Sequence, residues 1–352
     1  MVATHPVPRR DESRLLILSR DTGKRNHALF GDIARFLRPR SLLVVNDTRV
    51  IPARLSATKS TGGRVEVLLV EKLAAQGAEA RGWQEDWRAL TRGLGQQPPR
   101  ARLRFSGDLE AEILARGPRG EVELRFSGPG RSDLLTRIDE IGCIPLPPYI
   151  VAARRERGSL VSPDDDKIRY QTVYACQPGA IAAPTAGLHF TEQLLTTLQG
   201  QGHEIARITL HVGPGTFRPV TTSDPTAHQL DGERYEVSET AAESLRQAQA
   251  QGRPIVAVGT TVVRTLETLA RLGPLAAGRG STSLYLLPGT EFRVVTDLVT
   301  NFHLPRSSLL MLVAAFAGRE RVLDAYRDAV EHGFRFYSYG DAMFIRPGNL
   351  PE

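Results

Sequence analysis

Helical segments alternate with short apolar runs over most of the chain, and no other feature of the sequence restricts the fold as strongly. Ser238 can cap a helix that ends at Gly252, and the apolar run 255–258 follows. After the turn 259–261, a second helix runs to about Arg271. This alternation predicts an α/β fold, with a mostly parallel sheet and flanking helices.

Two earlier stretches have the same order. Thr191 can cap a helix that ends near Gly200, and residues 204–211 form the next expected strand. Residues 28–46 read as a helix followed by a strand. We therefore expect the α/β domain to include the start of the chain.

Short strands replace this alternation in the region before residue 128. Polar and apolar residues alternate there with the period of two that is typical of half-buried strands, and the turns at 61–63 and 117–120 favour hairpins. The expected strands are residues 64–70, 87–91, 101–105 and 121–126. We expect a small β-barrel or sandwich of residues 56–144, inserted into an α/β domain of residues 1–55 and 145–352.

The charge balance is basic, since 45 Lys and Arg residues against 39 Asp and Glu residues give a formal net charge of +6. Such a surplus fits a polyanionic partner, because attraction to phosphates supplies most of the non-specific affinity of proteins for nucleic acids. A solubilising surface is the alternative. A run of arginines in the insert, with no acidic residue among them, could face RNA phosphates or form a solvated strand face: Arg88, Arg92, Arg100, Arg102 and Arg104.

Two cysteines, Cys143 and Cys176, are too few for a disulfide framework and lack the spacing of zinc ligands, so we expect no metal. The first residues lack the pattern of a signal peptide, and the longest apolar run, 309–317, is well short of the ~20 residues that span a bilayer. We therefore expect a cytoplasmic protein that does not bind membranes. Because the run 309–317 is apolar on all faces, it predicts a buried helix.

Polar residues follow four of the expected strands, at 46–49, 211–217, 259–261 and 300–308. In open α/β sheets, ligands bind at the carboxyl ends of the strands, where helix N-termini present free N–H groups. Each cluster alone could be ordinary turn chemistry. Because all four occupy equivalent positions, we expect them to share one site.

Three side chains near these strand ends stand out. His189, directly before a helix cap, and His211, at the end of a strand, are acid–base candidates, with a structural role as the alternative for each. Arg264 lies in the first turn of its helix, where the helix dipole disfavours a cation, so a functional role competes with a structural one. Glu267 and Arg271, one turn apart on the same helix, are expected to form a solvated ion pair.

Several familiar motifs are missing. No strand is followed by Gly-x-Gly-x-x-Gly, which weighs against a dinucleotide oxidoreductase and a conventional methyltransferase. The sequence also has no P-loop, no His-Glu-x-x-His and no Gly-x-Ser-x-Gly. By themselves the residues indicate a basic two-domain enzyme that binds a polar ligand at its strand ends, and they do not reach the reaction.

Six blocks of sequence, in order along essentially the whole chain, resemble the S-adenosylmethionine:tRNA ribosyltransferase-isomerase family of queuosine biosynthesis. They are residues 46–54, 145–150, 169–175, 179–191, 300–305 and 336–343. Blocks of this length are far more specific than a single glycine motif. The family has an α/β domain with an inserted β-barrel-like domain, in agreement with the pattern above.

By this resemblance, the chain transfers and isomerises the ribosyl part of S-adenosylmethionine, its co-substrate, onto a 7-aminomethyl-7-deazaguanine base. That base occupies the wobble position of tRNAs with GUN anticodons, and the product is epoxyqueuosine, with adenine and methionine released. The sulfonium acidifies the C5′ hydrogens of the ribose, so a side-chain base can start the elimination of adenine without a metal or redox cofactor. The expected partner is therefore tRNA and not DNA, and the expected state is a monomer.

The resemblance also implies roles for single residues. We expect acid–base chemistry from His189 and His211, with Asp47 and Glu233 behind them. Arg264 is the expected partner of the methionine carboxylate. The other residues expected around S-adenosylmethionine are Thr185, Gly187, Gly259, Thr260, Thr261, Asn301, His303, Arg306 and Asp341.

The chain departs from the family pattern at two places. The family's Gly-Ala-Gly turn reads Gly-Pro-Gly here, at residues 213–215. In the family's His-x-Met-His-x-Glu block, His228 and Glu233 are kept, but Asp231 stands where the second histidine is expected. Asp231 either supplies the same polar contact or marks a tRNA-binding homologue without activity. Another S-adenosylmethionine-dependent RNA-modifying enzyme is the enzymatic alternative.

Overall fold

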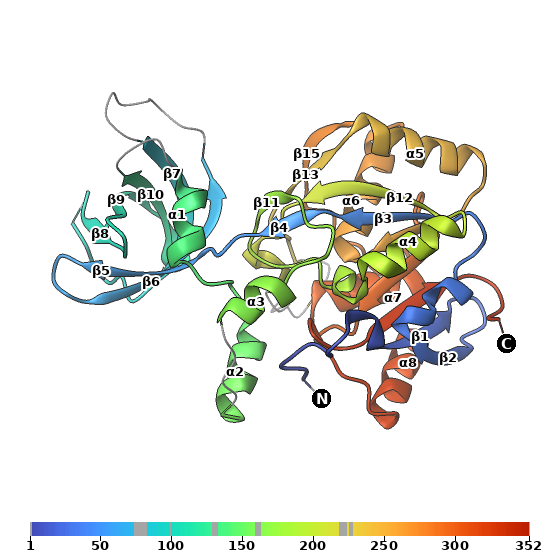
Figure 1. Ribbon diagram of the computed structural model, residues 1–352. Coiled ribbons are helices and arrows are strands. Elements are labelled where there is room, and N and C mark those ends of the chain that lie inside the picture. Colours follow the sequence, from blue (N-terminus) through green and yellow to red (C-terminus); the bar gives the residue numbers. More distant parts are fainter. Residues whose placement is uncertain are drawn as a thin grey trace.

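The computed structural model describes residues 2–73, 83–98, 100–128, 133–158, 163–217, 224 and 228–351. They form two parts that stand side by side, an α/β domain and a closed β-barrel (Figure 1). This arrangement confirms the fold class that the sequence predicts. Among the described residues, no helix is both long and apolar enough to cross a membrane.

A nine-stranded sheet forms the centre of the α/β domain. In sheet order its strands are β15 (Gly278–Thr282), β13 (Glu233–Val237), β12 (Glu204–Leu210), β3 (Leu42–Asn46), β14 (Ile255–Val258), β16 (Asp297–Asn301), β17 (Ala342–Arg346), β1 (Arg14–Ser19) and β2 (Arg25–Leu29). The central strands β12, β3, β14 and β16 are parallel, as is the pair β17–β1. The remaining neighbours are antiparallel, so the sheet is mixed rather than mostly parallel. Antiparallel pairs occur because β1 and β2 form a hairpin, while β13 and β17 run against the central strands.

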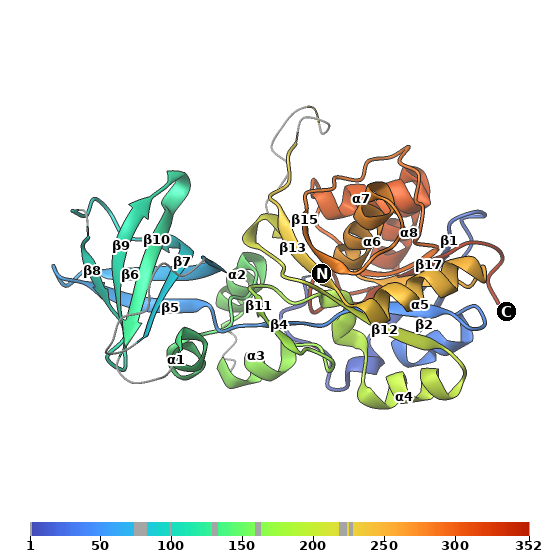
Figure 2. The ribbon, with the colours of Figure 1, turned by 90° about the horizontal axis from the view of Figure 1, so that it is seen from above.

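Helices cover both faces of this sheet (Figure 2). One face carries α5 (Glu239–Ala250), α6 (Thr260–Leu272), α7 (Ser308–Ala317) and α8 (Arg319–Glu331); the other carries α4 (Glu192–Gly200) and the 3-10 helices η2 (Phe30–Arg35) and η4 (Thr185–His189). In β3, Leu42 and Val44 pack against the first group, and Leu43 and Val45 pack against the second, because side chains alternate along a strand.

The predicted helix starts are confirmed. The side chains of Thr191 and Ser238 each accept a hydrogen bond from the backbone N–H three residues on, at the starts of α4 and α5. The helix expected within residues 28–46 is different: β2 extends to Leu29, and only the six-residue 3-10 helix η2 separates it from β3. Further elements of this domain are η1 (Arg10–Glu12), α2 (Pro148–Glu156), α3 (Pro163–Arg169), η5 (Pro214–Phe217) and the parallel pair β4 (Thr48–Val50) and β11 (Gln177–Ala180).

The predicted ion pair of Glu267 and Arg271 forms, but the prediction that solvent surrounds it is wrong. The two side chains do pair, at 2.8 Å, but Glu267 is completely buried. Its carboxylate accepts the backbone N–H groups of residues 293–295, at distances between 2.9 and 3.1 Å. Helical spacing alone could not reveal this, because the covering segment lies more than twenty residues further along the chain.

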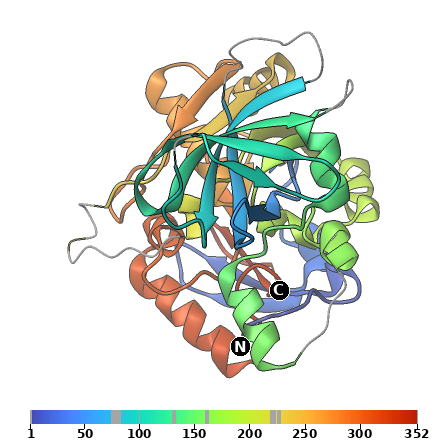
Figure 3. The ribbon, with the colours of Figure 1, turned by 90° about the vertical axis from the view of Figure 1, so that its left-hand side faces the viewer.

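Six antiparallel strands close the barrel, in the order β10 (Glu121–Gly128), β7 (Trp83–Arg92), β6 (Arg64–Lys72), β5 (Arg54–Lys59), β8 (Arg102–Arg104) and β9 (Glu110–Arg116). The 3-10 helix η3 (Pro118–Gly120) joins β9 to β10, and α1 (Leu134–Ile141) packs Leu134 and Ile138 into the barrel core. Strands β5 and β9 were not among those that the sequence pattern predicts. Figure 3 shows the barrel in front of the α/β domain, viewed from the barrel side.

Two chain segments connect the barrel to the α/β domain, and they lie next to each other; we call this junction the neck. Arg54, which begins β5, donates its backbone N–H to the Cys143 carbonyl at 3.1 Å, and the Cys143 N–H returns to the Arg54 carbonyl at 2.9 Å. The two connecting segments are thus hydrogen-bonded to one another, at the neck between the barrel and the α/β domain (Figure 1).

Candidate active site

The four central strands end at one edge of the sheet, so the polar clusters that follow them converge there, as the sequence indicates. Asn46 is completely buried at the end of β3 and ties three of these segments together. Its side-chain amide accepts the Leu210 N–H at 3.0 Å and donates to the Leu210 carbonyl at 2.9 Å. The same amide lies 3.4 Å from the Thr261 hydroxyl at the start of α6.

A cleft of about 340 Å³ lies beside these strand ends, between the sheet and the barrel. This volume falls within the range of ligand pockets of small molecules. The loop after β12, the start of β13 and the first turn of α6 form one side, and strands β6, β7 and β10 of the barrel form the other. The polar side chains that line it are Glu71, Arg88, Glu121, His211, Asp231, Glu233, Arg234 and Arg264.

His211 directly follows β12 and lines this cleft. Its Nδ1 atom lies 2.8 Å from the Thr48 hydroxyl. Gly179 packs against the ring so closely that an added Cβ atom would sit 2.8 Å from Cε1, which is shorter than Cβ contacts allow. Partial burial, and to a smaller degree the positive charge of Arg234, lower the pKa of His211. The imidazole is therefore neutral at neutral pH.

Glu233 and Arg264 form a buried ion pair in the wall of the cleft. Both side chains are only 5% exposed, and the Arg264 guanidinium donates to Glu233 Oε2. Oε1 of Glu233 accepts the Gly213 N–H at 3.2 Å, so the pair also fixes the turn that follows His211. The charge of Arg264 thus faces Glu233, and its contact with the methionine carboxylate of the co-substrate stays a prediction.

A chain of charges crosses the cleft between the two domains. Glu71 of the barrel pairs with Arg88 at 2.9 Å and with Arg234 of β13 at 3.1 Å. Sequence reasoning missed Glu71 and Arg234, because the two residues lie in different domains and no local pattern connects them. For Arg88 the sequence predicts a contact with RNA phosphates or a solvated strand face, and neither reading places it in this cleft.

Six of the residues expected around S-adenosylmethionine gather in a second cavity, of about 40 Å³. Val212 lines both this cavity and the larger cleft, so the two adjoin. Gly259 adopts a φ of 98°, a conformation that favours glycine, where β14 turns into α6. The six residues are Thr185, Gly259, Thr260, Thr261, Asn301 and His303. Burial lowers the pKa of His303 to about 4.

His189 does not reach the cleft. It is buried in η4, where Nδ1 lies 2.7 Å from the Ser13 hydroxyl and Nε2 lies 3.2 Å from the Asn301 amide nitrogen. Its ring stacks on Phe30, with 5.0 Å between centroids. Burial lowers its pKa to about 3, which makes it a weak base. With both ring nitrogens engaged, His189 has the surroundings of a structural histidine.

Four further expected site residues also lie outside both cavities. Asp47 is buried, its pKa is raised by that burial, and it accepts a hydrogen bond from the Thr209 hydroxyl at 2.7 Å. Gly187 packs beneath Tyr174, whose hydroxyl an added Cβ atom would approach to 2.0 Å. Asp341 accepts backbone N–H groups from Arg14 and Arg335, and Arg306 is exposed with a φ of 55°.

The arginine run of the barrel is largely paired with acidic residues of neighbouring strands. Arg102 and Arg104 pair with Glu110, and Arg100 pairs with Glu112, at distances between 3.4 and 3.7 Å. Both glutamates lie on β9, a strand that the sequence pattern does not predict. Their negative charges offset part of the positive charge of the arginines. These three arginines are exposed, and a contact of the run with RNA phosphates stays a prediction.

Residues 230–233, where Asp231 occupies the position at which the resemblance leads us to expect a histidine, also line the cleft. Asp231 lies over the turn after His211, since a Cβ atom added to Gly215 would sit 2.5 Å from its Oδ2. His228 instead contacts the edge of the Tyr285 ring, with 5.6 Å between centroids. Of the two residues kept in this block, only Glu233 lines the cleft.

Comparisons with known proteins agree over almost the whole chain. The family model described as queuosine biosynthesis protein matches residues 1–345. The chain is 48% identical over 346 residues to an S-adenosylmethionine:tRNA ribosyltransferase-isomerase of Syntrophotalea carbinolica, covering 98% of this chain and 96% of that protein. A protein of the same name from Anaeromyxobacter dehalogenans strain 2CP-C is 50% identical over 348 residues, covering 98% and 95%. The crystal structure of an S-adenosylmethionine tRNA ribosyltransferase from Thermotoga maritima is 36% identical, covers 98% and 96%, and superposes with a TM-score of 0.53.

Proposed function

The chain belongs to the queuosine biosynthesis protein family and acts as an S-adenosylmethionine:tRNA ribosyltransferase-isomerase, and we propose that this activity resides in the cleft beside His211. The main support for this proposal is the position of His211. Its neutral imidazole lines a cleft whose walls are the polar strand ends on one side and the barrel on the other. S-adenosylmethionine is the co-substrate. Its ribosyl part would occupy the cleft, where a base and fixed charges surround it.

We assign the role of general base to His211. The Thr48 hydroxyl lies 3.4 Å from the Gln177 carbonyl, to which it can only donate. It then accepts a hydrogen bond from Nδ1–H of His211, which leaves Nε2 without a proton. Nε2 can thus remove a C5′ proton next to the sulfonium, after which adenine leaves. A lowered pKa keeps this nitrogen neutral, as a base requires.

Other charged residues of the cleft have positioning roles in this proposal. The Glu233–Arg264 pair holds the turn 213–215 against His211, and the pair Glu71–Arg234 joins the barrel to the same wall. The second cavity, which Gly259 and Asn301 line, extends the cleft toward the strand ends. Because it holds only about 40 Å³, it can take a small terminal group of the co-substrate and not the nucleoside.

The precise substrate and state of the enzyme are part of the proposal. The accepted tRNA would have a GUN anticodon and carry 7-aminomethyl-7-deazaguanine at the wobble position. Attack of its amine on the sugar, followed by epoxide closure, would expel methionine and give epoxyqueuosine. We further propose that the enzyme works as a monomer in the cytoplasm, where its tRNA substrate is found.

A product assay tests this function. The protein is incubated with S-adenosylmethionine and a tRNA with the aminomethyl base, and adenine and methionine are quantified together with the modified nucleoside. Release of both in equal amounts supports the proposal. Formation of S-adenosylhomocysteine would indicate methyl transfer instead, and tRNA binding without turnover would indicate an inactive homologue.

Two histidine variants locate the base. His211→Gln is expected to lower turnover at least ~100-fold, as for the loss of a general base. His189→Gln serves as the comparison, and we expect its folded fraction to turn over within a few-fold of the native protein. Loss of activity in folded His189→Gln with native rates in His211→Gln would overturn the assignment.

A further inference from the structure

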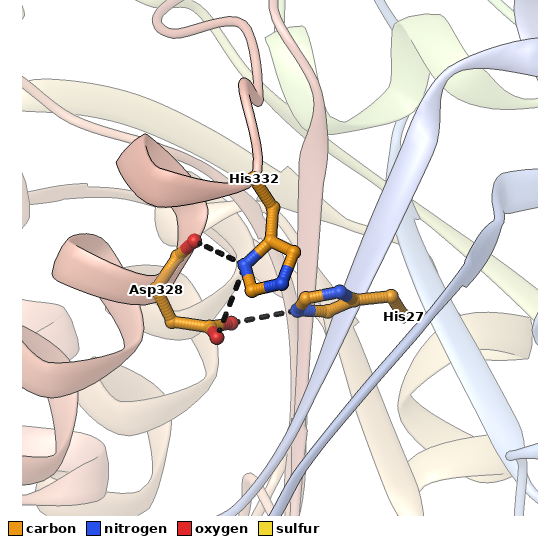
Figure 4. A group of neighbouring side chains, drawn as sticks. All are labelled: His27, Asp328 and His332. Carbon is orange, nitrogen blue, oxygen red and sulfur yellow. Dashed lines mark hydrogen bonds and ion pairs between the residues drawn. The ribbon is translucent and has the colours of Figure 1, made fainter.

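Two histidines and an aspartate come together beside β2, the outermost strand on the side of the nine-stranded sheet that is far from β13 and the cleft. His27 lies on the edge strand β2, and Asp328 and His332 lie at the C-terminal end of α8 (Figure 4). One ligand atom from each residue can be chosen so that all three lie within 4.8 Å of one another. No step of the proposed chemistry uses these residues.

The hydrogen bonds within the cluster orient the two imidazole rings and determine which ring nitrogens can bind a metal ion. Nδ1 of His332 donates to the Asp328 backbone carbonyl at 2.8 Å and lies 3.3 Å from Asp328 Oδ1. In the neutral imidazole, this donation makes Nε2 the nitrogen with a lone pair for an ion. Metal-binding histidines characteristically donate their second ring nitrogen to a carbonyl or carboxylate in this way. Nε2 of His27 lies 2.6 Å from Oδ2 of Asp328, where a cation could take the place of the shared proton.

The local electrostatics favour a cation. The carboxylate of Asp328 faces both imidazoles, and the C-terminal end of α8 contributes the negative end of its helix dipole. The Arg14 guanidinium lies 4.0 Å over the Phe334 ring and donates to the backbone carbonyl of His332, and within the described part of the chain no ion pair joins it to Asp328. The side chains of His27, Asp328 and His332 are 28%, 18% and 50% exposed, so an ion can enter from solvent.

We propose that His27, Asp328 and His332 form a binding site for a divalent transition-metal ion such as Zn²⁺, which fastens helix α8 to the edge strand β2. Two imidazoles and one carboxylate are a donor set that zinc accepts, with water as the fourth ligand. Bonds of about 2.0 to 2.1 Å in a tetrahedron bring the donor atoms to ~3.3 Å from one another. The exposed His332 side chain can turn to close the remaining distance.

Zinc binding to the complete, untagged protein tests the site. Metal-free protein is dialysed against a buffered series of Zn²⁺ concentrations, and bound zinc is measured by mass spectrometry. We expect saturation at one ion per chain, with a rise in the thermal midpoint because the ion binds only the folded state. His27→Gln and Asp328→Asn should each abolish both effects.

The control is His5→Gln, which removes a partly buried histidine outside the cluster and the cleft and should leave zinc binding unchanged. Because the cluster lies near the surface, we expect each variant to fold. Circular dichroism verifies this. Absence of a saturable site, or native zinc binding in the folded His27→Gln and Asp328→Asn proteins, would show that the three residues form only an ion-pair cluster.

Discussion

Nδ1 of His211 lies 2.8 Å from the Thr48 hydroxyl, so the histidine that follows β12 is oriented by a side chain that follows the neighbouring strand β3. Thr48→Val keeps the shape of the side chain and removes this hydrogen bond. We expect kcat to fall about fivefold, because a hydrogen bond contributes ~1 kcal/mol and each 1.36 kcal/mol corresponds to about one order of magnitude in rate. Single-turnover measurement of adenine release checks this, and an unchanged rate would remove Thr48 from the assignment.

The pH dependence should report the charge next to His211. Burial, and then Arg234, lower the pKa of this base below its ordinary value of 6.5, so kcat/KM should decline only as the pH falls through that lowered pKa. Arg234→Gln removes the positive charge that contributes to this lowered pKa. The acid midpoint should therefore move upward, toward 6.5. Arg319→Gln, which removes an exposed arginine on α8, should leave the midpoint unchanged.

Gly179→Ala should displace the base without unfolding the protein. The new methyl group would lie 2.8 Å from Cε1 of His211, and the φ of 148° at this position is unfavourable for other residues. A misplacement of about 1 Å costs on the order of 100-fold in rate. Gly200→Ala is the matched control, because no atom lies within 4 Å of the Cβ position there. Equal kcat in the two variants would contradict the packing of His211 on Gly179.

Glu233→Gln leaves Arg264 buried without its charge partner. Breaking such a pair costs about 3–5 kcal/mol of the free energy of unfolding, so the urea midpoint of the α/β domain should fall. Both tryptophans of the chain, Trp83 and Trp87, lie in the barrel, so their fluorescence reports the barrel alone.

Circular dichroism of the same Glu233→Gln samples reports mainly the helices of the α/β domain. We expect the dichroism transition to shift and the fluorescence transition to stay. Glu140→Gln, which disrupts an exposed pair with Arg137, should shift neither transition.

Local patterns predicted what depends on local sequence. The starts of α4 and α5 and the strand ends follow from caps and apolar runs a few residues long. His211 was found because it ends such a run. The environment of His189 could not be predicted, since its partners Ser13 and Asn301 are 176 and 112 residues away along the chain. Glu71 and Arg234 were missed for the same reason, because their contact forms only when two domains meet.

The backbones of Arg54 and Cys143 are paired at the neck, where the chain leaves the α/β domain and where it returns. For the α/β domain, the whole barrel therefore has the same effect as one long surface loop. Since the two ends of the insert meet, the α/β domain must close a loop at this point whether the insert is long or short, and loop entropy grows only slowly with length. Evolution could therefore enlarge, shorten or exchange this module without changing the register of any strand in the nine-stranded sheet.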